Sequence, residues 1–489
     1  MTITAELIMI PIPAIGHLPP VIEFSKRLIS QTNRLSVTIV LIRTPYAPEI
    51  ESFSDSLAAS CDPDRIKFIR VSGPNIPPLE SIKSAHTFFP QFLDSQKNAV
   101  REALLADRAK QSGSSVSTVV VGVVADILTT AVVEEVGREL EAPTYLFFPS
   151  CGAVLSMLLS FPAEFQPAVA AGDPDGEIFF PGFASHVPHR MLPATILEEE
   201  GYAALNEHVG RFREVKGILL NSYEELEAHA VESLVGNSLL PPVFCVGPVL
   251  DLKGQGKLGR TSSSIEKIMT WLDDQPRDSV VFMCFGSVGS FSDAQLKEIA
   301  IGLELAEDRR FLWVMRESPP KEGFGMPKDY IAYSESALAG RLGEGFLERT
   351  EGRGMVCGWV PQAAVLAHEA VGGFVSHCGW NSTLESLWHG VPVLAWPMYG
   401  EQQMNAFYLV TELGLAVEMR ADYRMEEGKV VKGEEVARKM ELLMDGEGEV
   451  RRKVKEMSKA ARRAVVEGGS SFDAYGGFVD LVMKNKPID

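Results

Sequence analysis

The chain has 489 residues, a length that predicts two or three domains. Hydrophobic residues make up 46% of it and charged residues 23%, which is typical of a globular protein and excludes a wholly disordered or fibrous one. The net charge of −19 would repel nucleic-acid phosphates and anionic lipid headgroups, so neither is expected as the main partner.

Cysteine usage and the apolar segments give an expectation for the compartment. Six cysteines are too few for a disulfide scaffold in a chain of this length, and no two form a Cys-x-x-Cys pair. The N-terminal apolar run lacks a basic segment and contains Glu6, which argues against a secretory signal. No stretch reaches the ~18 apolar residues that could span a bilayer. We therefore expect a cytoplasmic protein with reduced thiols and no membrane span.

The first half of the chain alternates short apolar strands with amphipathic helices. The strands are apolar almost throughout, which is typical of strands buried on both faces of a parallel α/β sheet. Strands are predicted at 6–13, 35–43, 116–126 and 143–148, and helices at 21–30 and 129–141.

The same pattern restarts in the second half. Strands are predicted at 278–287, 310–316, 354–360, 372–377 and 391–397, with a helix at 293–306. Residues 251–264 between the two series are rich in Gly, Ser and Lys, a composition typical of a linker. The sequence therefore predicts two Rossmann-like α/β domains, at 1–248 and 265–470, joined by a linker at 249–264.

The linker glycines allow a second interpretation. Gly254, Gly256 and Gly259 have the Gly-x-Gly-x-x-Gly spacing of a dinucleotide-binding turn, and Asp278 follows at about the expected distance. In that fold the glycines form the turn that opens the helix, whereas here five residues separate Gly259 from the first apolar helix position. A flexible hinge is favoured, and an NAD-dependent oxidoreductase remains the alternative.

A strand, a tight turn and a helix follow one another around residue 380. The strand at 372–377 ends at His377, Gly379 allows the turn, and Asn381 and Ser382 open the helix. A helix N-terminus after a strand binds anions through its free N–H groups, and these side chains add donors. The pattern predicts a diphosphate site without a metal. Alternatively, Ser382 and Glu385 form a capping box and His377 is structural.

The 44-residue segment from Trp359 to Gln402 resembles the signature sequence of plant UDP-dependent glycosyltransferases, glycosyltransferase family 1. Further similar segments lie at 271–287, 217–227, 343–349 and 16–20, so the resemblance covers nearly the whole chain. It implies an α/β GT-B fold, in which two Rossmann-like domains with parallel sheets face a cleft and a C-terminal helix, at 471–489 here, returns to the first domain.

The resemblance also implies roles for individual residues. Trp359 would stack on uracil near Gln362, and Glu385 would accept from the ribose hydroxyls. The diphosphate would be held by Ser287, His377, Asn381 and Ser382, and the sugar by Trp380, Glu401 and Gln402; Val360 and Tyr399 complete the donor-binding set. The family usually has Asp where this chain has Glu401, and Gln402 resembles glucose-using members.

His17 is the candidate general base for the acceptor hydroxyl. It follows the first predicted strand, and Asp126 ends another, so both are expected at the carboxyl edge of one parallel sheet, where ligands bind. Asp126 could orient the imidazole and stabilise its protonated form, as in a catalytic triad. The alternative for Asp126 is an N-cap of the helix that follows, and both roles are compatible.

The acceptor and the cofactors are less well defined by the sequence. Phe88, Phe89, Phe148 and Met191 lie in apolar segments that could line a pocket for a flat hydrophobic alcohol or phenol, although each could equally be core. No metal-ligand spacing is visible, so neither a metal nor a cofactor is expected. The resemblance implies an inverting O-glycosyltransferase using UDP-glucose on a flavonoid, another phenolic or a terpenoid, and acting as a monomer. A non-catalytic nucleotide-sugar binder is the remaining alternative.

Overall fold

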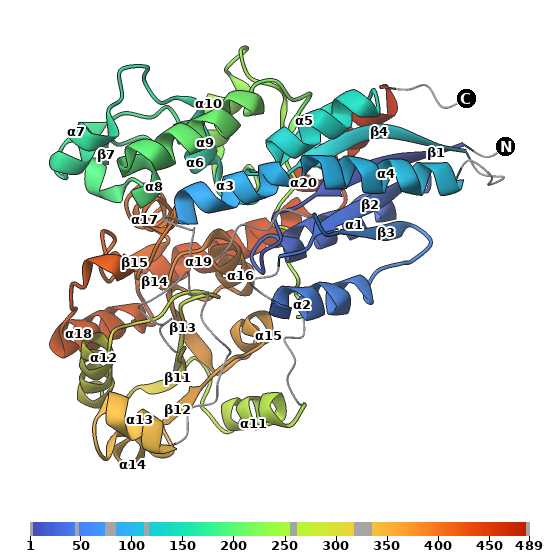
Figure 1. The fold of residues 1–489 in the computed structure, drawn as a ribbon. Coiled ribbons are helices and arrows are strands. Elements are labelled where there is room, and N and C mark those ends of the chain that lie inside the picture. Colours follow the sequence, from blue (N-terminus) through green and yellow to red (C-terminus); the bar gives the residue numbers. More distant parts are fainter. Residues whose placement is uncertain are drawn as a thin grey trace.

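The N-terminal half of the chain forms a seven-stranded, entirely parallel sheet (Figure 1). The computed structural model describes residues 3–44, 48–73, 85–111, 117–254, 262–316 and 335–485. The strands stand in the order β3-β2-β1-β4-β5-β8-β9. Their bounds are β1 (Ile3–Ile10), β2 (Leu35–Ile42), β3 (Ile66–Val71), β4 (Ser117–Ala125), β5 (Thr144–Phe148), β8 (Ile218–Leu220) and β9 (Val243–Cys245).

This sheet is buried on both faces, which explains its unbroken apolar strands. Alternate residues of β1 point in opposite directions: Ile8 and Ile10 join one hydrophobic cluster, and Leu7 and Met9 join another. The helices of this half are α1 (Leu18–Gln31), α2 (Pro48–Ala58), α3 (Ala85–Ser95), α4 (Lys97–Gln111), α5 (Thr130–Glu139), α6 (Gly152–Leu159), α7 (Pro167–Gly172), α8 (Ala194–Leu197), α9 (Glu199–Phe212) and α10 (Ala228–Val235). A small antiparallel pair, β6 (Glu177–Ile178) and β7 (Val187–Pro188), and a 3-10 turn at His189–Met191 complete it.

The second half forms a six-stranded parallel sheet in the order β12-β11-β10-β13-β14-β15. Its strands are β10 (Val280–Cys284), β11 (Arg310–Val314), β12 (Gly354–Cys357), β13 (Val371–Ser376), β14 (Val393–Ala395) and β15 (Ala416–Glu418). Its helices are α11 (Ser262–Asp273), α12 (Asp293–Leu305), α13 (Glu335–Leu342), α14 (Phe346–Arg349), α15 (Gln362–Leu366), α16 (Trp380–His389), α17 (Gln402–Phe407) with a π-helical turn at Tyr408–Glu412, a 3-10 turn at Met425–Glu427, α18 (Gly433–Leu443), and α19 (Glu449–Ala464).

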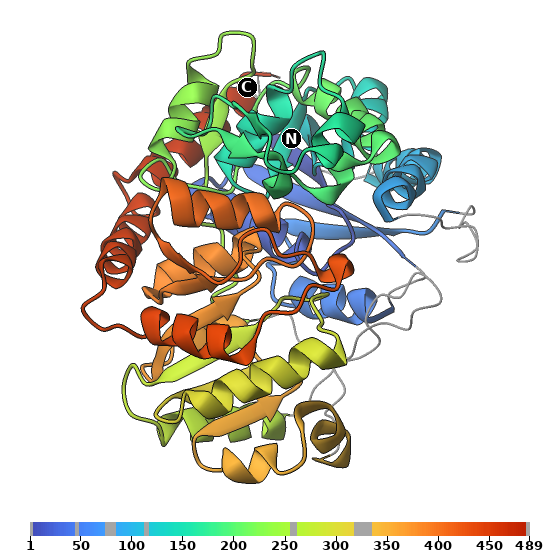
Figure 2. The ribbon, with the colours of Figure 1, turned by 90° about the vertical axis from the view of Figure 1, so that its left-hand side faces the viewer.

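The last helix, α20 (Ser470–Met483), returns to the first sheet. Figure 2 shows the two halves stacked, with the red C-terminal chain passing from the lower to the upper at one side. Phe478 packs against Phe24, Tyr145 and Phe244 of the first half, and Tyr475 stacks on Phe24 with 5.2 Å between ring centroids. The aromatic contacts of α20 therefore join the end of the chain to its beginning, as predicted.

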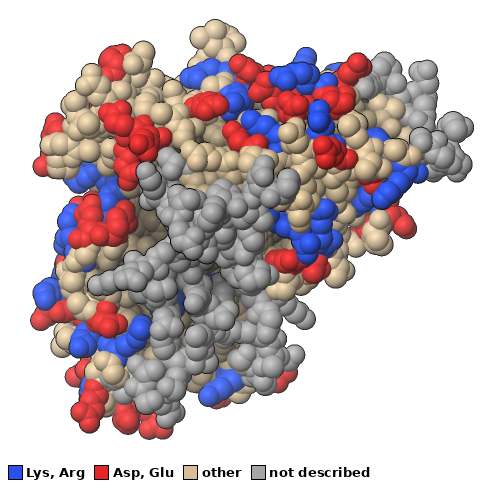
Figure 3. Space-filling view, in the orientation of Figure 1, with Lys and Arg blue, Asp and Glu red and all other residues tan. Residues whose placement is uncertain are grey.

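The predicted strands and helices all occur, and both sheets are parallel as expected. The strands β3, β8, β9 and β15 of the parallel sheets and the antiparallel pair β6 and β7 were missed, all but β3 because they have only two or three residues each. The middle of the predicted linker, with Gly256 and Gly259, lies outside the described residues, but α11 already begins at Ser262. The domain boundaries at 248 and 264 stay a prediction. Figure 3 shows Lys and Arg interspersed with Asp and Glu over the described part of one face.

A candidate active site between the two sheets

His17 and Asp126 form a hydrogen-bonded pair at one edge of the first sheet. The strands β1 and β4 are parallel neighbours with Ile10 opposite Ala125, so the residues that follow them emerge at the same edge. The Nδ1 atom of His17 lies 2.8 Å from Oδ2 of Asp126. The Asp126 side chain is 1% exposed, whereas that of His17 is 24% exposed. The imidazole can therefore meet a ligand while its partner carboxylate stays buried.

Backbone donors hold the Asp126 carboxylate in place. The Ile12 N–H donates to Oδ2 at 3.1 Å and the Ile127 N–H to Oδ1 at 2.7 Å, which compensates for burying its negative charge. The residue that precedes α5 is Thr129, so Asp126 is not the N-cap of that helix and this alternative is wrong. Asp126 is left with one evident task, which is to orient His17.

The surroundings favour a charged His17 more than water would. Burial alone would lower the pKa of His17, but the negative charge and hydrogen bond of Asp126 outweigh it, and Glu401 adds to their effect. The net result is a pKa above the ordinary value of 6.5. Because Glu401 belongs to the second half of the chain, its influence shows that both halves contribute charge around the imidazole.

The second sheet presents its own set of side chains at its carboxyl edge. His377 follows β13 and Ser287 follows β10, and these strands pair with Cys284 opposite Ser376. Gly286 has φ +75°, and a Cβ there would lie 2.4 Å from His377 Nε2; a Cβ at Gly379 would lie 2.5 Å from the same atom. Only glycine fits at either position, because the imidazole lies directly against both backbones.

His377 is neutral at physiological pH. Burial lowers its pKa to about 4, and the positive charge of Arg316 contributes in the same direction. A neutral imidazole has a single N–H and no positive charge, and a backbone hydrogen bond with Cys284 competes with an anion for that N–H.

Arg316 itself is a site residue that the sequence reasoning missed. It follows β11, at the same sheet edge as Ser287 and His377, and its guanidinium donates to the Ser287 carbonyl. The sequence did contain a signal that could have identified Arg316. A positively charged residue stands directly after a predicted strand, and that strand neighbours the one that leads to Ser287. A positive charge thus lies beside the predicted diphosphate site.

The helix α16 begins without a side-chain cap. Its N-cap is Gly379, and Ser382 and Glu385 do not form the capping box that the sequence allowed, so that alternative is wrong. Both instead accept hydrogen bonds from Nε2 of Gln362, at 2.9 and 2.8 Å. Burial raises the pKa of Glu385 to about 7 against the opposing effect of this hydrogen bond. The first N–H groups of α16 are consequently left for a ligand.

Residues 359 to 362 lie beside this helix. Val360 is buried, Trp359 is partly buried against the hydrophobic cluster that contains α1 and α20, and Gln362 begins α15. Trp359 and Gln362 therefore lie close to α16, and their contact with a nucleotide base stays a prediction.

Two side chains of the first turn of α16 reach the other half of the molecule. Nδ2 of Asn381 donates to the Gly16 carbonyl at 2.7 Å, and Nε1 of Trp380 donates to the Asn221 carbonyl at 2.7 Å. The Trp380 indole is buried and its N–H is used, so the expected sugar contact could come only from its backbone. These bonds bring the predicted diphosphate site next to the loop that carries His17.

The predicted sugar-binding residues follow β14. Gln402 begins α17, is buried, and its Oε1 accepts from the backbone N–H groups of Met398 and Tyr399 at 2.9 and 3.1 Å. These bonds fix the amide with Nε2 as its remaining donor. Tyr399 is partly buried against the core of the second half, and Glu401 directly precedes α17.

The four predicted acceptor residues are all apolar and largely buried. Phe88 and Phe89 lie on α3 with 5.7 Å between their ring centroids, and Met191 ends the 3-10 turn. Phe148 is 1% exposed and packs edge-to-face against Phe212, which places it in the core of the first half. Only Phe89 among the four is more than slightly exposed.

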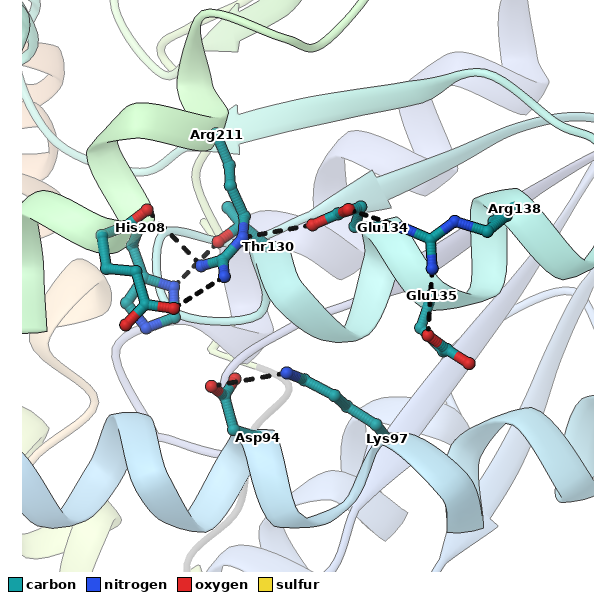
Figure 4. A network of polar contacts seen from close by, with 9 residues as sticks. Asp94, Lys97, Thr130, Glu134, Glu135, Arg138, His208 and Arg211 are labelled. Atoms are coloured by element: carbon teal, nitrogen blue, oxygen red, sulfur yellow. Dashed lines mark hydrogen bonds and ion pairs between the residues drawn. The ribbon is translucent and has the colours of Figure 1, made fainter.

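A polar network supports the helices behind these residues (Figure 4). Nδ1 of His208 on α9 lies 2.8 Å from Oγ1 of Thr130 on α5, and Arg211 pairs with Glu134 across the same helices at 3.2 Å. Asp94 of α3 lies close enough to His208 to oppose the lowering of its pKa by burial. Hydrogen bonds thus join α5 to α9, and the charge of Asp94 on α3, the helix that carries Phe88 and Phe89, acts on the same histidine.

Two absences hold for the described part of the chain. No three His, Cys, Asp or Glu side chains are grouped closely enough there to hold a metal ion. None of its helices is long and apolar enough to cross a bilayer.

Comparison with known proteins places the fold and the site in one family. Residues 266–427 match the family model described as UDP-glucoronosyl and UDP-glucosyl transferase. The chain is 44% identical over 484 residues to UDP-glycosyltransferase 71K1 of Malus domestica, covering 98% of each. It is 42% identical over 480 residues to flavonol 3-O-glucosyltransferase UGT71C4 of Arabidopsis thaliana, covering 97% of each.

Solved structures agree with the sequences. The Medicago truncatula UGT71G1 complexed with UDP-glucose superposes with a TM-score of 0.87 at 38% identity, with 98% of each chain covered. A transferase from Siraitia grosvenorii in complex with UDP gives a TM-score of 0.82 at 38% identity, covering 98% of this chain and 100% of that one. The predicted GT-B fold is confirmed. The chain belongs to the plant UDP-glycosyltransferase family, whose members are enzymes that transfer a glycosyl group from a UDP-sugar.

Proposed function

We propose that the enzyme is an inverting O-glucosyltransferase that transfers glucose from UDP-glucose to a hydroxyl group of a small hydrophobic plant metabolite. The observation that carries the proposal is the His17–Asp126 pair, which lies one residue from the contact between Gly16 and Asn381. A general base and a predicted anion-binding helix end thus meet between the two halves. Two relatives are named as a flavonol 3-O-glucosyltransferase and a flavonoid 3-O-glucosyltransferase, which favours a flavonoid or a related phenol as the acceptor.

The mechanism begins with the acceptor hydroxyl next to Nε2 of His17. Asp126 accepts from Nδ1–H, so the neutral imidazole presents Nε2 as a proton acceptor. As the hydroxyl oxygen forms its bond to the anomeric carbon of glucose, its proton passes to Nε2. Asp126 then stabilises the imidazolium, which accords with the raised pKa of His17.

The bond between the anomeric carbon and the β-phosphate oxygen breaks in the same step, and UDP leaves with the electron pair. A single displacement from the face opposite UDP inverts the anomeric centre. The developing charge on UDP would meet the free N–H groups of α16, the Ser382 hydroxyl and the neutral His377, with Arg316 nearby. No metal is needed in this scheme.

The other two candidate functions have less support. An NAD-dependent oxidoreductase rested on the linker glycines alone, of which only Gly254 is among the described residues. A non-catalytic binder would not need a histidine that is paired with a buried carboxylate and is itself partly exposed.

The test is release of UDP from UDP-glucose in the presence of a panel of flavonols and simpler phenols. We expect release with at least one flavonoid, a β-glucoside product by NMR, and no release when UDP-glucose is replaced by buffer. His17→Ala serves as the matched control, because it should bind UDP but turn over about 10²–10⁴-fold more slowly. An α-linked product would contradict inversion, and UDP binding without turnover on any acceptor would favour the binder.

A further inference from the structure

Asn381 lies in the predicted diphosphate site, yet its side chain is bonded to the other half of the molecule. Nδ2 is 2.7 Å from the carbonyl oxygen of Gly16, 365 positions earlier in the chain. Because a carbonyl can only accept, the amide must turn its NH₂ group toward Gly16. The Oδ1 atom is buried and has no hydrogen-bond partner among the described residues.

This orientation limits what Asn381 can offer a diphosphate. Phosphate oxygens accept hydrogen bonds, so they cannot satisfy Oδ1 and can bind only an N–H. Nδ2 carries two hydrogens, of which Gly16 takes one. The second N–H is therefore the group with which Asn381 can contact the donor, and both partners would then bind the same nitrogen.

The Gly16 carbonyl belongs to the same rigid peptide unit as the N–H of His17. A hydrogen bond to that oxygen therefore helps to fix the plane from which the His17 side chain starts. The His17 N–H donates to the Ala14 carbonyl at 3.0 Å, and no atom would lie within 4 Å of a Cβ placed on Gly16. The space beside Gly16 where a side chain would lie is therefore open, and the bond from Asn381 is a contact that reaches this peptide from the other half of the molecule.

We propose that Asn381 is a positioning residue that links the donor diphosphate to the general base. One N–H of its amide holds the Gly16–His17 peptide, and the other binds the diphosphate of UDP-glucose. The donor then adds a second partner to an amide that already holds the Gly16–His17 peptide, so that the diphosphate and the His17 loop are bound by the same nitrogen. The inference rests on the proposed function, because it assigns His17 as base and this helix end as diphosphate site.

Ser382 provides a matched control on the same turn of α16. It is the next residue, it is also predicted to bind the diphosphate, and its hydroxyl is bonded to Gln362 within its own half. Among the described residues its hydroxyl makes no hydrogen bond with the loop of His17. Loss of Ser382 should therefore weaken donor binding without changing how well His17 works.

The experiment is a double-mutant cycle on turnover at saturating UDP-glucose, with unsubstituted phenol as an acceptor that stays protonated near neutral pH and therefore needs the base. The variants are Asn381→Ala and Ser382→Ala, each with His17 intact and with His17→Ala. With His17 intact we expect Asn381→Ala to lower kcat about tenfold, an effect in the range found for directly coupled residues. In the His17→Ala background the same change should lower kcat less than about twofold, because no base remains to be positioned.

Ser382→Ala should instead lower kcat by the same factor in both backgrounds. Calorimetric titration with UDP should show weaker binding for both single variants, which confirms that each lost a donor contact. Thermal melting checks folding, and Asn381→Asp offers a second variant of equal size that removes both N–H donors. Equal factors for Asn381→Ala in the two backgrounds would overturn the inference and leave Asn381 as a donor ligand alone. Failure of the unmodified enzyme to release UDP would overturn the proposed function instead.

Discussion

The guanidinium of Arg316 donates a hydrogen bond to the backbone carbonyl of Ser287, which joins the ends of the neighbouring strands β11 and β10. The charge of Arg316 also contributes to the low pKa of His377, so the arginine lies close to that imidazole. Both Ser287 and His377 belong to the predicted diphosphate site. The predicted diphosphate site therefore contains a positive charge, whereas the sequence analysis had placed only neutral hydrogen-bond donors there.

Replacing Arg316 should weaken binding of the diphosphate and not of the nucleoside. We expect Arg316→Gln to lower UDP affinity about ten- to a hundredfold, since a hydrogen bond to a charged group contributes ~1.5–3 kcal/mol, and to leave uridine affinity unchanged. Arg316→Lys should lose less, because it keeps the charge. Calorimetric titration of each variant with UDP and with uridine measures both effects.

Arg353 gives the matched control for Arg316. Its Nη1 donates to the carbonyls of Leu303 and Arg309 at 2.9 and 3.1 Å, at the opposite edge of the same sheet. Arg353→Gln should lower the melting temperature without changing the ratio of UDP to uridine affinity. An equal loss of UDP and uridine binding in Arg316→Gln would show that Arg316 is structural only.

The pH dependence of turnover should follow the His17–Asp126 pair. The base must be neutral, and it becomes protonated as the pH falls through a pKa that lies above the ordinary 6.5, so activity should fall on the acidic side. Asp126→Asn removes the largest influence that raises this pKa, so the acidic limb of kcat/KM should move to lower pH. Turnover on the plateau should also drop, by about 10²–10⁴-fold, because the imidazolium loses its partner.

A pH profile of kcat/KM from about pH 5 to 9 in both proteins measures the shift around the histidine pKa. The His17→Ala variant, assayed with a phenol that is fully ionised over this pH range, should lack this limb altogether. An acidic limb at the same pH in Asp126→Asn as in the unmodified enzyme would contradict the assignment of the pair.

Removal of divalent metal ions should leave activity intact. The helix end contributes only ~0.3–1 kcal/mol when exposed and up to ~2 when partly buried, so hydrogen bonds from His377, Ser382 and the charge of Arg316 must supply the rest. The assay is UDP release after treatment with EDTA, with and without added Mg²⁺ or Mn²⁺. A loss of activity that added metal restores would show that the diphosphate site is wrongly described.

Gln402 should determine the choice between glucose and galactose. Its Oε1 is fixed by the N–H groups of Met398 and Tyr399, so Nε2 points in one defined direction. Gln402→His should raise the ratio of kcat/KM for UDP-galactose over UDP-glucose, measured with one acceptor. Equal losses with both donors, and hence an unchanged ratio, would make Gln402 a structural residue.

Arg424 should stabilise the segment that carries the predicted acceptor residue Met191. Its Nη2 donates to the carbonyls of Arg190 and Leu192, on either side of Met191, from the second half of the chain. Arg424→Met leaves two carbonyls without this donor, which should lower the free energy of unfolding by about 1–3 kcal/mol for each buried group. We expect a lower melting temperature and a higher KM for the acceptor, with UDP affinity unchanged.

The exposed Arg452 is the control for that change. It pairs with Glu456 one turn away on α19, and loss of such a pair changes stability by only ~0.5 kcal/mol. Arg452→Met should therefore behave like the unmodified enzyme in both melting and acceptor kinetics. An unchanged acceptor KM in a destabilised Arg424→Met would restrict Arg424 to a role in stability.

The sequence by itself determined the parallel sheets and the positions of His17, Asp126 and His377 at strand ends. These features depend on local patterns: buried parallel strands are apolar throughout, and the first polar residue after such a strand lies at its carboxyl edge. Ser287 was reached through the resemblance, and the structure places it shortly after β10.

Only the tertiary structure decided which of these side chains meet. The contact between Asn381 and Gly16 joins residues 365 positions apart, and no periodicity specifies it. It depends on how the two halves pack. The hydrogen bond from the Trp380 indole N–H to the Asn221 carbonyl depends on the same packing. The bonds from Gln362 to Ser382 and Glu385 replaced the capping box for the same reason, because a local side-chain interaction gives way when a partner from another element offers a better donor.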